Sequence, residues 1–296
     1  MNGYLTLIDL VVVAGAAVVL PVALGRWAAW LVVAASTAMA LSVDPGPAGL
    51  AWSLPWAVVA AAATADAGIP VLRRSIPAGW GPIQPPTLDG MASVAAPAFA
   101  LVAGIGLVES CGDLGVFGFG EPITRLAAVH FTFAGAATTA LGRAARRAAV
   151  DGSRHRQRAA TTGLVLALVA PPVVGLGFFT EAALPQVGGA VLMSAAAYLI
   201  AGCQLAEAWA ARRTRVGRLL AVSGLSVWVP MALAVGWALA QHTGGPALSI
   251  PDMARIHGSL NAFGFVGCGL AARWLVDHPA PATMGPVPTD AVAVTA

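Results

Sequence analysis

Charged residues are scarce in this chain, and lysine is absent. Only 10% of the 296 residues are charged, whereas 58% are apolar, and the mean hydropathy is +0.80. A soluble domain usually carries about a quarter charged residues, so this chain has little with which to cover a folded core in water. The composition excludes an ordinary soluble protein and favours a membrane protein.

Clustered cations and paired cysteines are also missing. The arginines are scattered between hydrophobic runs and do not line one face, so we expect no nucleic-acid partner. Cys111, Cys203 and Cys268 occur singly, without CxxC or metal-ligand spacing, and we interpret them as small buried apolar residues.

The first hydrophobic run begins at Leu5 without a basic segment before it, so a cleaved signal peptide is not expected.

Long apolar runs, by contrast, fill most of the chain. A bilayer core of roughly 30 Å needs about 17 to 25 helical residues per crossing. The sequence predicts nine such spans, of which the second is short and the third contains Pro55; they are residues 5–25, 27–43, 50–68, 91–111, 122–142, 160–180, 187–210, 217–240 and 253–276. We therefore predict an all-α, polytopic transmembrane helix bundle that forms a single domain over residues 1–278.

The tail at residues 279–296 is rich in Pro, Ala and Thr and is predicted to be disordered.

The arginines also predict the orientation of the bundle. Most of them follow odd-numbered spans, and the connections after even-numbered spans contain none; those connections carry Asp44, Asp113, Glu181 and His242 instead. Because positive loops stay in the cytoplasm, the N-terminus is predicted outside and the C-terminus in the cytoplasm of a multi-pass protein of the cell membrane. Arg125 and Arg255 depart from this rule, since each lies near the external start of a span.

Three segments combine polar residues with the apolar background. They are Glu109-Ser110-Cys111, residues 120–135 (GEPITRLAAVHFTFAG) and residues 252–265 (DMARIHGSLNAFGF). Charged groups inside the hydrocarbon are costly, so those that occur there usually face a partner or a cavity. The second and third segments enter the membrane from the same side, so their side chains can share one cavity.

The spacing within these segments suggests particular roles. Glu121 lies at the positive end of a helix dipole, Arg125 follows at i+4, and His130 lies about nine residues, or roughly 13 Å, deeper. His257 and Asn261 are four residues apart and so lie on one helix face. We predict Glu121, His130, His257 and Asn261 as catalytic residues.

Around this catalytic set we predict binding roles for Arg125, Arg255 and Glu109. Each prediction has a structural alternative. Glu121 and Arg125 can form an ion pair that only stabilises a helix start, and His130 can be a hydrogen-bonded packing residue. His257 with Asn261 can join two helices, and Glu109 can lie at the level of the lipid headgroups.

The segments EPITRLAAVHFTFAG and MARIHGSLNAFGF resemble the two signature segments of the YndJ-like family of bacterial membrane proteins. The resemblance is clearest over roughly residues 90–276. It implies a multi-pass membrane protein and marks Glu121, His130, His257 and Asn261 as motif positions. Members of that family are sometimes labelled transporters by analogy, and the resemblance implies no particular reaction.

Two functions remain open from the sequence. The first is an intramembrane enzyme that uses acid–base chemistry on a lipophilic small molecule, as an isomerase, cyclase or hydratase, because imidazole exchanges protons near neutral pH. The second is a small-molecule transporter, although no internal repeat is apparent. The compact polar set in one leaflet favours the enzyme.

A haem or metal protein is a third possibility, with His130 and His257 as ligands. No third histidine lies within a span, so we expect no metal and no cofactor. Apart from the lipid bilayer and a lipophilic small-molecule substrate, no partner is predicted, and no pattern indicates an oligomeric state.

Overall fold

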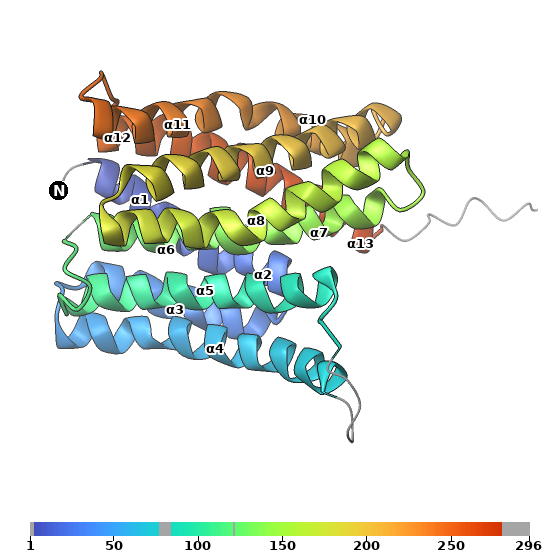
Figure 1. Ribbon diagram of the computed structural model, residues 1–296. Coiled ribbons are helices and arrows are strands. Elements are labelled where there is room, and N and C mark those ends of the chain that lie inside the picture. The colour runs from blue at the N-terminus through green and yellow to red at the C-terminus, as the bar shows by residue number, and fades with distance from the viewer. Residues whose placement is uncertain (1–2, 77–83, 121, 280–296) are drawn as a thin grey trace, which may run out of the picture.

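A computed structural model describes residues 3–76, 84–120 and 122–279, and in these ranges the regular structure is entirely helical. The helices run side by side with roughly parallel axes, and their connections lie at the two ends of the bundle (Figure 1). Glu121 and residues 280–296 of the tail lie outside the described residues.

The helical elements join into nine continuous segments within the described ranges, numbered in chain order. Segment 1 is α1 (Gly3–Ala14), η1 (Gly15–Val19) and α2 (Leu20–Leu24), and segments 2 to 4 are α3 (Trp27–Ser42), α4 (Pro47–Ser75) and α5 (Leu88–Gly112). Segment 5 is α6 (Ile123–His130), η2 (Phe131–Ala137) and α7 (Thr138–Ala148), and segments 6 and 7 are α8 (Arg154–Thr180) and α9 (Ala183–Ala210). Segment 8 is α10 (Arg215–Ser226) and α11 (Trp228–Thr243), and segment 9 is α12 (Ile250–Met253), η3 (Ala254–Gly258), η4 (Leu260–Cys268) and α13 (Gly269–Asp277). The η elements are π-helical turns.

Each predicted span corresponds to one of these segments. In the described part of the chain, seven segments are long and apolar enough to cross a membrane; they are segments 1, 3, 4, 6, 7, 8 and 9. Segment 2 has 16 residues, which gives it a length of roughly 24 Å. Segment 5 also falls outside this set of seven, and its first helix contains Arg125 and His130. Segment 3 extends beyond the predicted limits, because neither Pro55 nor Pro70 ends its helix.

Polar residues mark where several helices begin. The hydroxyl groups of Thr87, Ser153, Thr214 and Ser249 each accept a hydrogen bond from a backbone N–H in the first turn of the following helix. Such N-caps satisfy backbone donors that have no partner within the helix. The starts of α5, α8, α10 and α12 are therefore encoded locally.

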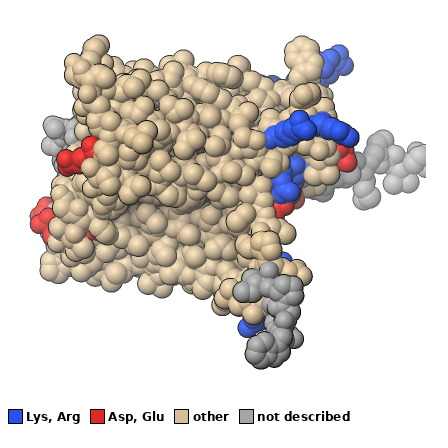
Figure 2. Space-filling model, in the orientation of Figure 1, with Lys and Arg blue, Asp and Glu red and all other residues tan. Residues whose placement is uncertain are grey.

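The two ends of the bundle differ in charge. Figure 2 shows blue arginine side chains at the right end of the molecule, whereas the left end shows only red carboxylates on this face. We call the first the arginine-rich end; it holds the connections near Arg73, Arg147, Arg154 and Arg213. Arginines are thus gathered at one end of the bundle, where carboxylates also lie.

Segment 5 lies between the two main hydrophobic cores. Phe133, Ala137 and Leu141 belong to the core formed with α8, α9 and η4, whereas Ala128 and Ala136 belong to the core formed with segments 1 to 4. A helix buried on two faces has little contact with lipid, so it tolerates polar side chains that a lipid-facing helix does not.

Two glycines allow segment 5 to approach α5 closely. A Cβ atom at Gly135 would lie 2.8 Å from the Phe99 side chain, and one at Gly106 would lie 3.0 Å from the carbonyl oxygen of Thr124. Small residues at such contacts let two backbones approach, which strengthens helix packing in a membrane. The packing fixes α6 against the end of α5 that carries Glu109 and Ser110.

An ion-pair cluster holds segments 6, 7 and 9 together near the arginine-rich end. Both terminal nitrogens of the Arg273 guanidinium donate to the Glu207 carboxylate at 2.7 Å, and Arg156 lies 3.7 Å from the same carboxylate. Paired, bidentate contacts of this kind are among the stronger hydrogen bonds in proteins. They fix the rotation of α13 relative to α9.

Candidate functional site

Six of the seven predicted site residues lie in the described part of the chain, near the end opposite the arginine-rich end. Glu109 is on α5, Arg125 and His130 are on α6, Arg255 and His257 are on η3, and Asn261 is on η4. Glu121 lies outside the described residues, so its predicted pairing with Arg125 stays a prediction. Segments 5 and 9 are in contact through η2 and η4, and α1 contacts both α6 and η3.

Arg125 connects three helices. Its Nη1 donates to Asp9 Oδ1 of α1 at 2.9 Å, and its Nε donates to Ser110 Oγ of α5 at 3.2 Å. The side chains of Arg125 and Asp9 are only 14% and 28% exposed. A half-buried cation at this end of the bundle therefore has a carboxylate partner within reach, which offsets part of its cost of desolvation.

Glu109 is buried, with 4% of its surface exposed. Its Oε1 accepts a hydrogen bond from the backbone N–H of Phe117 at 3.2 Å. The carboxylate thus binds the connection between α5 and α6 and helps to fix where α6 begins. Arg255 differs from both, since it lies at the surface, 3.5 Å from Asp252 in the preceding turn.

His257 is held in one orientation by the neighbouring segment 8. Its Nδ1 lies 2.7 Å from the carbonyl oxygen of Pro230, and because a carbonyl only accepts, Nδ1 donates. In the neutral imidazole the lone pair is then on Nε2. The amide nitrogen of Asn261 lies 3.4 Å from Nδ1 and 3.3 Å from Nε2, so it contacts the ring without selecting one nitrogen. The Pro230 carbonyl therefore orients His257, and Asn261 lies beside the ring.

His130 contributes an unsatisfied polar atom in the interior of the bundle. Its Nε2 is buried and has no hydrogen-bond partner among the described residues, and its ring packs edge-on against Phe131 with the centroids 5.5 Å apart. A buried polar atom without a partner costs about 1 to 3 kcal/mol. The segments that carry the two imidazoles are in contact through η2 and η4.

The residues of this cluster lie next to π-helical turns. His130 is immediately followed by η2, His257 is part of η3, and Asn261 is part of η4. Single π-helical turns inside α-helices occur frequently at functional sites, because they alter the local backbone hydrogen bonding and the direction of side chains. Another element of this kind, η1 of segment 1, packs against η2.

Comparison with known families places these observations in context. The model of a family described as YndJ-like protein matches residues 6–265. The chain belongs to the YndJ-like family. The match begins in segment 1, so it covers segments 1 to 3 as well as the polar segments that carry the resemblance in the sequence. Searches of curated proteins and of solved structures found no match.

The structure adds residues to the site of this YndJ-like protein that the sequence analysis missed. Asp9, Ser110 and the carbonyl of Pro230 all contact predicted residues. Asp9 is 116 positions from Arg125, and only the position of Arg125 on the predicted external side indicated that it needed a partner. The Pro230 carbonyl carries no sequence signal.

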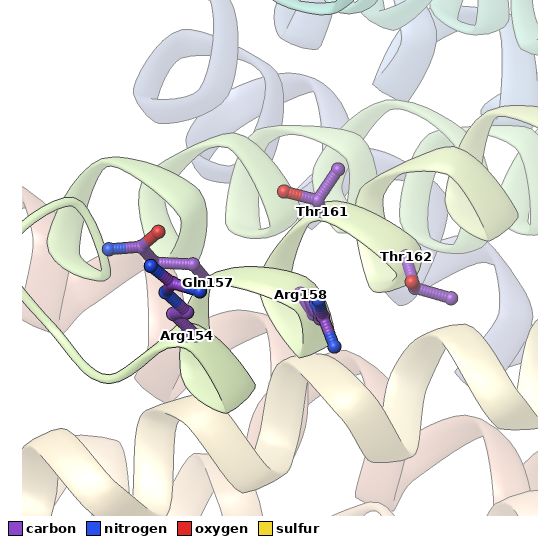
Figure 3. A pocket seen from close by; sticks show the side chains of 5 residues that line it. All are labelled: Arg154, Gln157, Arg158, Thr161 and Thr162. Carbon is purple, nitrogen blue, oxygen red and sulfur yellow. The ribbon is translucent and has the colours of Figure 1, made fainter.

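No group of three or more His, Cys, Asp or Glu side chains suited to a metal ion occurs within residues 3–76, 84–120 and 122–279. Two hollows lie near the arginine-rich end, away from His130 and His257. The larger, of about 480 Å³, is lined by Arg154, Gln157, Arg158, Thr161 and Thr162. Figure 3 shows that all five project from the first turns of α8. A single helix supplies the lining, so this hollow is an open depression on the surface.

Proposed function

We propose that all nine segments cross the cell membrane, with the N-terminus outside and the arginine-rich end in the cytoplasm. The distribution of arginine supports this orientation. Segment 2 is short for a bilayer of roughly 30 Å, but a modest mismatch can be accommodated by local thinning of the bilayer. Segment 5 is enclosed by other helices and does not need to be apolar on every face. Residues 1–278 form one domain in this proposal.

We further propose that the protein is an intramembrane enzyme that applies acid–base chemistry to a lipophilic small molecule. The observation that carries the proposal is the buried, unpartnered Nε2 of His130, on a segment that contacts the one carrying the oriented His257. A site that keeps an unsatisfied nitrogen in a dry interior is suited to receive or deliver a proton once a substrate fills it.

The contacts suggest distinct roles for the side chains. The Nε2 of His257 is the proton acceptor, because its Nδ1 proton is held by Pro230. Asn261 orients the ring or a substrate oxygen, and His130 donates or receives the second proton. Glu121 supplies a carboxylate at the external entrance. Isomerisation, cyclisation and hydration need only such proton transfers.

The predicted binding residues take different parts in this proposal. Arg255 is exposed near the outer end of segment 9, so it is available to a substrate headgroup. Arg125 and Glu109 each contact another part of the polypeptide and position α1, α5 and α6. They therefore contribute to the shape of the site more than to substrate contact.

A proton-coupled transporter is the second candidate. The observation that favours it is the presence of π-helical turns in segments 1, 5 and 9, which contact one another. Irregular helices at mid-membrane are characteristic of transporters, where they surround the substrate site. In that case the histidines would carry a coupled proton and would not change the substrate.

Deuterium incorporation tests the enzyme even while its substrate is unidentified. Purified protein in lipid vesicles is incubated in D₂O with a lipophilic extract of the producing cells, and the extract is analysed by mass spectrometry. We expect carbon-bound deuterium, or a new isomer, in one compound. The His130→Gln and His257→Gln variants should each lower its formation at least a hundredfold, within the range that a positioned acid or base contributes.

His242→Gln is the matched control, because His242 is an exposed histidine that hydrogen-bonds to Gln186, away from the two buried imidazoles. It should behave as the wild type. Unchanged deuterium incorporation in both buried-histidine variants would refute the enzyme. Compound-dependent proton flux into sealed vesicles, without any chemical change in the compound, would identify the transporter instead.

A further inference from the structure

A second cavity lies between four segments at the arginine-rich end, far along the bundle from the histidines. It has a volume of about 260 Å³ and is lined by residues of α2, α4, α5 and α7 together with Arg26. Six of its ten lining residues are apolar, namely four alanines, Leu24 and Pro97, and the other four are Ser93, Arg26, Asp66 and Arg143. A pocket lined by small apolar residues and a few polar groups is the usual form of a small-molecule site.

Arg143 is the unusual member of this lining. It lies on α7, is half-buried, and its Nε is buried without a hydrogen-bond partner among the described residues. The nearby carboxylate of Asp89 is paired with Arg146 of the same helix. A guanidinium removed from water in this way is costly unless an anion and hydrogen-bond acceptors accompany it.

The charge of the lining limits what the ligand can be. Arg26 and Asp66 form an ion pair at the rim, where both are about half exposed, so the cationic charge that remains inside is that of Arg143. One net positive charge matches a monoanion, whereas Asp66 disfavours a dianion such as phosphate. Guanidinium groups bind carboxylates through two parallel hydrogen bonds, and the four alanines, Leu24 and Pro97 can contact a short hydrocarbon body.

We propose that this cavity is a binding site for a small organic monocarboxylate, whose charge contacts Arg143 and whose apolar body packs against α2, α4 and α5. The site is independent of the proposed acid–base chemistry and lies at the opposite end of the bundle. Its volume is just below the range typical of pockets for drug-sized ligands, so the ligand is short.

The proposal is tested with the full chain in discs of zwitterionic lipid, which contain no anionic lipid to compete. Binding of acetate, butyrate and hexanoate is measured by calorimetry and by the shift in Tm. Hexanoate should bind saturably, and affinity should rise about fourfold per methylene group until the cavity is full. Arg143→Gln should weaken hexanoate about ten- to a hundredfold, as expected for a lost hydrogen bond to a charged group.

Arg147→Gln is the matched control, since Arg147 lies one turn further along α7, is exposed and does not line the cavity. It should retain affinity to within about threefold, because an exposed charge acts weakly across solvent. Without ligand, Arg143→Gln should be at least as stable as the wild type, because it removes a half-buried cation. Ala67→Leu, which fills the cavity without changing its charge, should also weaken hexanoate at least tenfold and provides a second variant.

Several outcomes would overturn the proposal. The first is that hexanoate shows no saturable binding up to about 10 mM. The second is that Arg143→Gln or Ala67→Leu binds hexanoate with the same affinity as the wild type. The third is that Arg147→Gln loses as much affinity as Arg143→Gln. Competition by inorganic phosphate as effective as that by butyrate would also overturn the choice of a monocarboxylate.

Discussion

The roles of single residues in this protein depend on partners that are distant in the sequence. Arg125 is a cation on the side of the bundle where cations are otherwise rare, and its contact with Asp9 provides the opposite charge. The pair is partly exposed, so it contributes less than a fully buried pair. The same contact joins α1 to α6, which places segment 1 beside the histidine cluster.

Asp9→Asn is predicted to destabilise the protein and to loosen the site. Removal of one partner from this half-buried pair should lower the free energy of unfolding by about 1 to 3 kcal/mol. The control is Asp113→Asn, which changes an exposed aspartate at the same end of the bundle and should shift stability by no more than about 0.5 kcal/mol. Thermal unfolding in detergent measures both, and equal effects of the two variants would argue against the ion pair as a stabilising contact.

Whole helices are positioned by shape as well as by charge. Segment 5 reaches two hydrophobic cores because small residues face its neighbours, and Gly135 is the tightest such contact with α5, where the Phe99 ring occupies the space of a missing Cβ. This packing sets the height of α6, and so of His130, relative to α5.

Gly135→Ala is predicted to be destabilising even though alanine favours helices. The added methyl group would overlap Phe99, and overpacking of this kind costs about 1 to 3 kcal/mol. Gly188→Ala on α9 is the control, because nothing lies within 4 Å of its added Cβ, and it should be neutral or stabilising by up to about 1 kcal/mol. Unfolding temperatures compare the two, and the double variant Phe99→Leu with Gly135→Ala should recover part of the loss. Equal stability of the two single variants would contradict the packing argument.

At the scale of the whole molecule, arginines gather at one end of the bundle, and within the described ranges seven segments are long and apolar enough to cross a membrane. The remaining two, segments 2 and 5, decide whether the chain crosses nine times. Each lies between segments that run in the opposite direction, as the positions of the connections in Figure 1 require.

Reporter fusions test the crossing of these two segments directly. Fusions after Arg26 and Arg154 should report the cytoplasm, and fusions after Asp44 and Asp113 should report the exterior, because each cytoplasmic site is separated from each exterior site by an odd number of segments. Matching signals at Arg26 and Asp44 would show that segment 2 does not cross. Matching signals at Asp113 and Arg154 would show the same for segment 5.

Much of the helical framework was predictable because a long apolar run has few alternatives in a membrane. The helix of segment 3 is longer than the predicted span, because neither Pro55 nor Pro70 ends it. The contact between segments 5 and 9 followed from two polar runs that enter from the same side. Asp9 was missed because a single aspartate near the N-terminus resembles an interfacial residue.

The cavity around Arg143 had no sequence signal at all. Alanine and proline occur throughout the chain, and Arg143 matches the arginines that orient the connections after odd-numbered spans. Only the packing of four segments shows that this arginine is half-buried and the others near it are paired or exposed. The burial of Arg143 depends on the space left between packed helices, and no local sequence pattern predicts that space.

The π-helical turns have a consequence for comparing members of this family. A π-turn accommodates one extra residue within a helix, and loss of that residue would rotate everything beyond it by about 100°. In segment 9 the turns precede Arg273, whose two hydrogen bonds to Glu207 depend on the rotation of α13. Alignments of relatives should therefore allow one-residue gaps inside helices at η2, η3 and η4. Such a gap would indicate a change in the rotation of the helix, and the helix itself would be kept.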